Sequence, residues 1–479
     1  MLSHYTRLLK SVYHQQSSKN FLVSFAIRRM HILIAKVCDA MCGFGKTSAC
    51  IAMMNQKDKE RYIFITPYLS EVDRVKSLCK NRKFYSPEKS YEHNFSKLKA
   101  FHELLRQGRD IASTHALFSY YTEETKQLIL QGGYTLVLDE VMNIFQPAEI
   151  SNGDINILIK SRTIKACEQE FVWNDDDYTD GAFLDTKFKA KSNNLLKYRN
   201  EMYFWSIPPD IFISFKGIYI LTYMFEYQIQ RYFFDVYHIK YELIGVKKER
   251  GVYKFCPMSE MDRRLDLRSK IHILEHDKLN EIGNANGSLS FTWYNRAHAE
   301  SGRPKLEQLR CNLYNVFHNV YKTDANSKMW STFKAFKSVL KGKGYANGFI
   351  VYNKRATNEF SNKRHLAYCL NVYMQTWAKN YLIEKGAKNI SENMYAISTL
   401  IQWIFRSAIR NGEEVWLYLP SKRMRDLFKE WLNNLAEGKD LTQIILTEKK
   451  VWKDYYNENA LKFSGKINKS KKSETKNNG

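Results

Sequence analysis

The chain has 479 residues, of which 44% are hydrophobic and 14% aromatic, so it has material for two or three packed domains and is not a disordered or fibrous sequence. Its 74 basic and 50 acidic residues give a formal net charge of +24, which favours a nucleic-acid partner. Eight cysteines without a CxxC pair exclude the usual zinc and disulfide-framework spacings and favour the cytoplasm, and no uncharged stretch reaches the about 20 residues of a membrane span.

Residues 1–29 are expected to be a mature N-terminal extension. Their apolar part is short, has no small-residue cleavage site after it and runs into Arg28 and Arg29, which is atypical of a targeting peptide.

From residue 30 to about 235, short apolar runs alternate with helical patterns, which predicts a parallel sheet built from right-handed crossover units. The polar stretch at about 150–210, with its acidic NDDDYTD, interrupts this alternation and is expected to be an insertion or a lid. The expected strands are 31–37, 62–68, 108–118, 135–141 and 217–225.

A second alternating block extends from 236 to 440 and predicts another α/β domain. Residues 441–479 end in a lysine-rich run with few apolar residues, which predicts a disordered basic tail. The expected strands of the second block are 271–276, 348–353, 365–373 and 414–420.

The segment DAMCGFGKTSA, residues 39–49, has the parts of a phosphate-binding loop (Walker A). A strand precedes it, a glycine turn can point backbone N–H groups inward, Lys46 can reach phosphates, and Thr47 can reach Mg²⁺. Ala40 stands where the usual pattern has its first glycine. The expected nucleotide-binding residues are Ala40, Gly43, Phe44, Gly45, Lys46, Thr47 and Ser48.

The expected strand 135–141 contains the pair Asp139 and Glu140, about 90 residues after the loop. Asp139 is expected to hold Mg²⁺ with Thr47, and Glu140 to activate the attacking water. The loop and the carboxylates together predict a nucleotide site.

The order of these motifs resembles superfamily 2 (DEAD/DEAH-like) helicases, particularly the divergent type found in phages and mobile genetic elements. The resemblance covers roughly residues 30–425. AMCGFGKTS looks like motif I, DEVM like motif II, ITPYLSEVDRV like motif Ia, STHALF like motif Ib, and LTYMF, with Thr222, falls at motif III. It implies two tandem RecA-like domains with ATP and Mg²⁺ in the cleft between them.

The same resemblance implies contacts with a nucleic-acid strand in both domains. The segment 353–375 occupies the place of motifs IV and V. The implied contact residues are Thr66, Pro67, Ser113, Thr114, His115, Arg355, Thr357 and Asn358.

The segment 398–420 resembles motif VI, whose arginine completes the ATP site from the second domain. Gln402, Arg406 and Arg410 stand at i, i+4 and i+8, which places them on one face of a predicted helix. Arginine suits a developing phosphoryl charge because its fork is planar and always ionised. The spacing departs from QxxGRxxR, so either arginine can be the finger.

These features predict an ATP-dependent helicase or translocase, with DNA favoured over RNA, without membrane contact, and with replication proteins of a phage or mobile element as partners. A phage terminase-type packaging ATPase is the first alternative, although no strand-end acidic cluster for a nuclease follows residue 240. A nucleotide-gated binder without turnover is the second, because of Ala40 and the irregular motif VI.

Overall fold

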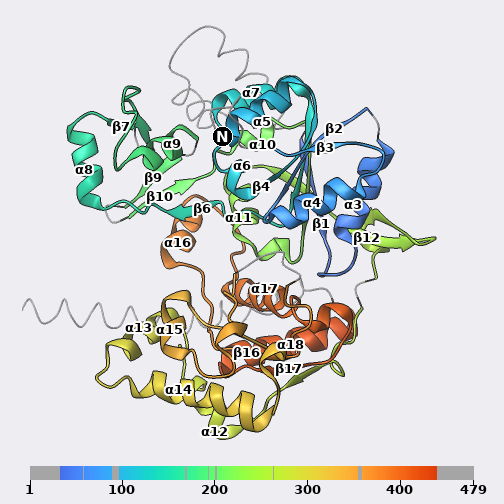
Figure 1. Cartoon of the computed structure of the whole chain (residues 1–479), viewed down its shortest axis with the longest axis vertical. Helices are drawn as coiled ribbons and strands as arrows, with labels where there is room; N and C mark the ends of the chain where they lie inside the picture. Colours follow the sequence, from blue (N-terminus) through green and yellow to red (C-terminus); the bar gives the residue numbers. More distant parts are fainter. Residues whose placement is uncertain are drawn as a thin grey trace, which may run out of the picture.

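In the computed structural model, residues 33–439 are described, except 58, 89–95, 168–169, 193, 200–201, 263 and 354–358. They form three sheets: one in a first domain, one in an inserted domain within it, and one in a second domain. Figure 1 shows the first domain above the second, with the inserted domain to one side. The fold class predicted from the sequence, two α/β domains with parallel sheets and an insertion, is confirmed. The predicted N-terminal extension and basic tail lie outside the described residues.

The first domain contains an eight-stranded sheet in the order β13-β12-β1-β11-β5-β2-β4-β3. All neighbours are parallel except the edge pair β12 and β13. The strands are β1 Ile34–Asp39, β2 Arg61–Thr66, β3 Phe84–Tyr85, β4 Asp110–Thr114, β5 Tyr134–Asp139, β11 Gly217–Thr222, β12 Lys240–Glu249 and β13 Val252–Pro257.

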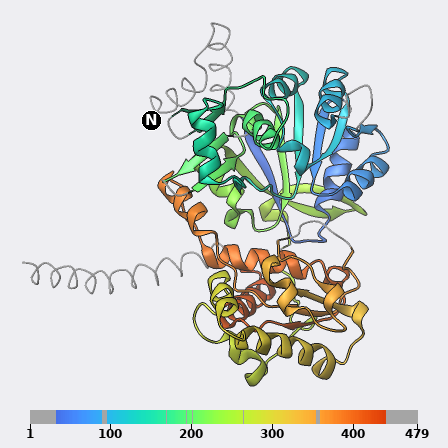
Figure 2. The same ribbon diagram turned by 60° about the vertical axis from the view of Figure 1, so that its left-hand side comes forward.

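Helices cover both faces of this sheet, which is why its central strands are continuous apolar runs. In β5, Leu136 and Leu138 pack into one core and Val137 into the other. Figure 2 shows the helices around the sheet. One core includes helices α3 Lys46–Gln56 and α4 Leu69–Leu78, and the other α5 Lys97–Arg106, α7 Glu123–Gly132, α10 Asp210–Ile213 and α11 Ile229–Val236.

The inserted domain contains a five-stranded antiparallel sheet in the order β6-β10-β9-β8-β7. Its polar sequence indicated an insertion but not this sheet. The elements are β6 Phe145–Pro147, α8 Asn152–Lys160, β7 Ile164–Cys167, β8 Glu170–Trp173, α9 Leu184–Ser192, β9 Asn194–Tyr198 and β10 Met202–Ser206.

The second domain contains a four-stranded parallel sheet in the order β14-β17-β16-β15. The strand predicted at 348–353 is wrong: a 3₁₀ turn occupies Ala346–Gly348, and Phe349 makes one isolated bridge to Trp330. The strands are β14 Ile271–Ile273, β15 Lys328–Ser331, β16 His365–Tyr368 and β17 Val415–Tyr418, and the main helices are α13 Phe291–Ala299, α14 Pro304–Asn315, α16 Thr376–Glu384, α17 Glu392–Ile404 and α18 Lys422–Glu437.

None of the helices in the described part of the chain combines the length and the apolar character that crossing a bilayer requires. Every cysteine side chain that the structure describes is a free thiol.

Candidate nucleotide site between the domains

The loop between β1 and α3 turns tightly at the carboxyl edge of the first sheet. Gly43 and Gly45 have φ values of +87° and +85°, a left-handed conformation that glycine adopts without strain. A β-carbon at position 45 would also overlap the ring of Tyr253 on β13. Lys46 is the first residue of α3 and is buried, and its Nζ donates to two carbonyl oxygens of the loop at 2.6 and 3.1 Å. The ammonium group therefore lies within the curve of the loop, beside the amino end of the helix.

Asp139 is the last residue of β5 and faces this loop. Thr47 Oγ1 donates a hydrogen bond of 3.1 Å to Asp139 Oδ1. Burial, together with the adjacent charge of Glu140, raises the pKa of Asp139 to about 7. The hydroxyl and carboxylate oxygens are thus held together in a position where a cation would stabilise the ionised carboxylate.

Glu140 follows β5 with φ +75°, which is unusual for a residue with a side chain and costs local strain. The surrounding sheet holds this conformation, because Glu140 N donates to Leu221 O at 2.9 Å. Thr222 Oγ1 also donates to Glu140 Oε2 at 3.3 Å, and Gln228 Nε2 donates to Thr222 Oγ1 at 3.1 Å. The carboxylate is therefore positioned by β11, the strand that contains the motif III-like segment.

The second domain contributes its motif VI-like segment to the same site. The single helix predicted for it is wrong, because α17 ends at Ile404 and Arg410 lies in a 3₁₀ turn at Ala408–Asn411. The three side chains nevertheless lie on one side of the site, as expected. Gln402, Arg406 and Arg410 line one cavity together with the loop between β1 and α3. Its volume is about 200 Å³, and it is lined by Cys42, Gly43, Gly45, Lys46, Thr47, Ser48, Glu71, Arg74, Asp139, Glu140, Gln402, Phe405, Arg406 and Arg410.

Two of the residues expected at the nucleotide do not line this cavity. Ala40 is buried and contributes its carbonyl oxygen to Lys46, whereas the ring of Phe44 packs against the cores of both domains. Conversely, Glu71 and Arg74 on α4 line the cavity and form an ion pair of 2.6 Å, although no role at the nucleotide was expected for either. Both lie in the segment ITPYLSEVDRV that resembles motif Ia, and its position after the strand next to β5 is a signal that could have identified them.

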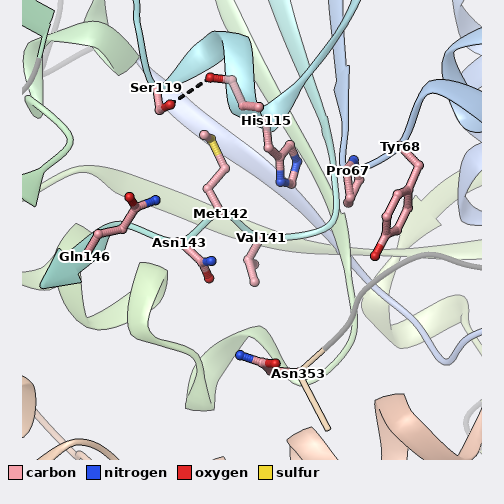
Figure 3. A pocket seen from close by; sticks show the side chains of 10 residues that line it. Pro67, Tyr68, His115, Ser119, Val141, Met142, Asn143, Gln146 and Asn353 are labelled. Atoms are coloured by element: carbon pink, nitrogen blue, oxygen red, sulfur yellow. Dashed lines mark hydrogen bonds between the residues drawn. The ribbon is translucent and has the colours of Figure 1, made fainter. Parts of the chain in front are cut away.

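The strand-contact residues implied by the helicase resemblance are only partly exposed. Thr66 and Ser113 are buried strand-end residues, and Thr114 accepts from Leu117 N to cap a short helix, α6 His115–Phe118. Pro67 and His115 line a second cavity, which Figure 3 shows. Arg355, Thr357 and Asn358 lie outside the described residues.

Comparisons with known proteins identify relatives of both the sequence and the shape. Residues 265–432 match the family model of the YonV C-terminal Rossmann-like domain, and residues 145–205 match that of the YonV middle domain. Over 411 residues the chain is 42% identical to the SPbeta prophage-derived uncharacterized protein YonV of Bacillus subtilis (strain 168), spanning 83% of this chain and 98% of that protein.

Solved structures of similar shape include one whose title names a helicase. The structure of S. tokodaii Xpd4 is 12% identical with a TM-score of 0.44, covering 88% of this chain and 97% of that chain. A structure described as XPD_Helicase is 10% identical with a TM-score of 0.37, covering 89% of this chain and 99% of that chain. These scores record a distant likeness of shape.

Proposed function

The chain belongs to the YonV family, and we propose that it is an ATP-driven motor that moves along nucleic acid, with DNA as its track. The observation that carries the proposal is the shared cavity, which the phosphate-type loop and Glu140 line from the first domain and Arg406 and Arg410 from the second. A ligand held by both domains favours closure of the cleft between them, and its breakdown favours opening. Repeated closure and opening is the elementary step of a translocating motor.

The residues present fit ATP with Mg²⁺. Mg²⁺ usually takes only one or two protein ligands and keeps several waters. The pair Thr47 and Asp139 matches that requirement, and no group of three or more His, Cys, Asp or Glu in the described part of the chain forms a competing site. Bound ATP with Mg²⁺ would supply the phosphoanhydride bond to be cleaved and the cation that offsets its charge.

The roles of the side chains follow from their positions around the cavity. Lys46 would exchange its carbonyl partners in the loop for phosphate oxygens. Glu140, held by Thr222, would orient the attacking water and accept its proton. Arg406 or Arg410 would stabilise the charge that develops on the transferred phosphoryl group.

The proposal also includes the domain bounds and the biological role expected from the sequence. We propose residues 30–235 and 236–440 as the two motor domains, and a role in the nucleic-acid metabolism of a phage or related element inside a bacterial cell. The net charge of +24 supports a polyanionic track.

The test is steady-state phosphate release by the purified chain, alone and with single-stranded DNA, duplex DNA or RNA. Lys46→Ala and Glu140→Gln are the two active-site variants. We expect one polymer to stimulate hydrolysis by the wild type. Glu140→Gln should lower kcat by at least about 100-fold, the scale of a lost general base, and Lys46→Ala by at least about 100-fold through the lost phosphate contact. Turnover that no polymer changes would contradict the motor and favour another ATPase, such as a packaging enzyme. Polymer binding without any turnover would favour a gated binder.

A further inference from the structure

A second cavity, of about 300 Å³, lies beside the nucleotide site at the carboxyl ends of β2, β4 and β5. Ligands of parallel α/β sheets bind at this edge. Pro67 follows β2, His115 follows β4, and Val141 to Asn143 follow the Asp139–Glu140 pair. The second domain contributes Asn353 from the opposite side, as Figure 3 shows. The cavity therefore spans the same interdomain cleft as the nucleotide site.

The chemistry of this cavity differs from that of a phosphate site. No Lys, Arg, Asp or Glu is among its lining residues, even though the chain has a large excess of cations. Tyr68, His115 and Met142 present flat or polarisable surfaces, whereas Asn143, Gln146 and Asn353 present amides that can both donate and accept hydrogen bonds. In Figure 3 Gln146 and Tyr68 lie on opposite sides of the view, with His115 above and Asn353 below. Such a combination suits an uncharged, planar group with a hydrogen-bonding edge.

Met142 and Asn143, which line this cavity, lie close in sequence to Glu140 of the nucleotide site. The backbone N–H of Met142 donates to Gln230 Oε1 at 2.8 Å, and Gln230 is fully buried. Only Val141 separates this anchored residue from Glu140. A group bound against Met142 and Asn143 thus lies two or three residues from the carboxylate assigned to hydrolysis.

We propose that this cavity binds one unstacked nucleobase of the strand on which the motor moves, and that Tyr68 stacks on it while the amides of Asn143, Gln146 and Asn353 read its edge. The inference rests on the proposed function and adds to it that the strand is held here by a base rather than by its phosphates. Stacking on aromatic side chains is a general source of affinity for single strands and tolerates every base. Because both domains contribute to the cavity, closure of the cleft tightens the grip on the base.

The experiment compares two labelled single strands of about 16 nucleotides, a length that covers a typical binding site. One is a thymidine strand and the other has the same backbone with abasic residues throughout. Fluorescence anisotropy gives the Kd of each for the full-length chain at fixed salt. We expect the abasic strand to bind at least about 10-fold more weakly, the factor that corresponds to one lost base stack.

Substitutions of Tyr68 and Asn353 then test whether these side chains cause the difference in Kd between the two strands. Tyr68→Ala should weaken binding of the thymidine strand about 10-fold and leave the abasic strand unchanged, and Tyr68→Phe should restore the loss. Asn353→Ala, at an exposed position of the second domain, should show the same selectivity, so the test does not depend on one fold-sensitive position. Leu69→Ala is the matched control, because this neighbouring side chain is 61% exposed.

The other outcomes distinguish failure of the base pocket from failure of the proposed function. Equal affinity for the two strands, or an equal loss on both in Tyr68→Ala and Asn353→Ala, overturns the base pocket. If both strands nevertheless stimulate ATP hydrolysis, the proposed motor stands and only this inference fails. If neither strand binds, and duplex DNA and RNA also leave hydrolysis unchanged, the proposed function fails with it.

Discussion

Asp39 shows how a single buried carboxylate joins the phosphate loop to the strand beside it. As the last residue of β1, it accepts hydrogen bonds from Met224 N at 2.7 Å and Phe225 N at 3.0 Å. These amides follow Thr222, the residue that positions Glu140. Burial raises the pKa of Asp39 to about 6, although the two amides and Lys46 act in the opposite direction.

This pKa predicts a pH-dependent stability that Asp39→Asn should remove. The folded chain holds the proton more tightly than the unfolded chain, whose pKa is 3.8, so Asp39 stabilises the fold at low pH and loses this contribution as pH rises from about 4 to about 6. Asparagine stays neutral throughout. Between pH 4 and pH 6 we expect the unfolding free energy of the variant to gain about 2 kcal/mol relative to the wild type. Each pKa unit is worth about 1.4 kcal/mol, and most but not all of the shift from 3.8 to about 6 is expressed in this range.

Urea unfolding of both proteins at a series of pH values measures this difference. It should level off above about pH 7, where Asp39 is ionised in both states. A difference that is constant from pH 4 to pH 8 would show that Asp39 has no raised pKa in the folded chain.

At the scale of elements, the segment from Gln402 to Arg410 combines two conformations rather than one helix. The break after Ile404 leaves Arg406 5% exposed and Arg410 exposed, although both line the nucleotide cavity. The two arginines can therefore be separated experimentally, because loss of a buried side chain affects folding whereas loss of an exposed one does not.

We expect Arg410→Ala to lower kcat on the order of 10³-fold, the scale of a lost arginine finger, with unfolding free energy within about 0.5 kcal/mol of the wild type. Arg406→Ala should lower both kcat and stability. Hydrolysis rates and urea midpoints of the two variants, with Arg303→Ala in the second domain as the exposed-arginine control, provide the measurement. Wild-type kcat in Arg410→Ala would assign the phosphate-sensing role to Arg406 instead.

The elements that the sequence predicted well are those buried on both faces. β2 and β5 are almost wholly buried, so they appear as continuous apolar runs and their ends place Thr66 and Asp139. The edge hairpin β12–β13 was not predicted, although polar and apolar residues alternate along part of it, a pattern typical of a half-exposed strand. Yet Tyr253 on this hairpin covers Gly45, so part of the candidate site depends on an element that no sequence motif marks.

The strand predicted at 348–353 failed for a different reason. Its apolar side chains are needed for packing but not for sheet pairing: Phe349 lies against Trp330 with ring centroids 4.9 Å apart, and Ile350 is buried in the second domain. A short apolar run indicates burial, and only tertiary pairing decides whether it becomes a strand.

At the scale of the whole molecule, the inserted domain makes a second contact between the two halves of the chain, away from the candidate nucleotide cavity. Phe204 on β10 lies 5.0 Å from the rings of both Trp377 and Tyr381 on α16 of the second domain. Tyr198 OH donates to Glu384 at 2.9 Å beside this aromatic contact. Figure 1 shows α16 between the inserted domain and the rest of the second domain. If the proposed motor opens and closes its cleft, we expect this apolar contact to be the pivot, because packed interiors resist gradual deformation.

The pivot predicts that Tyr381→Ala uncouples the inserted domain from the second domain. Removing this buried ring should cost about 3 kcal/mol of unfolding free energy, and amide hydrogen exchange should accelerate in β9 and β10, whose outer packing it supplies. Ile383→Ala is the matched control on the same helix, because its side chain is 52% exposed and its loss should change stability by less than about 0.5 kcal/mol. Hydrogen exchange in β9 and β10 that is the same in both variants would show that the inserted domain is held by its own core and does not depend on α16. Faster exchange in Tyr381→Ala alone, together with a reduced ATPase response to nucleic acid, would instead show that domain closure works against a fixed point built by the insertion.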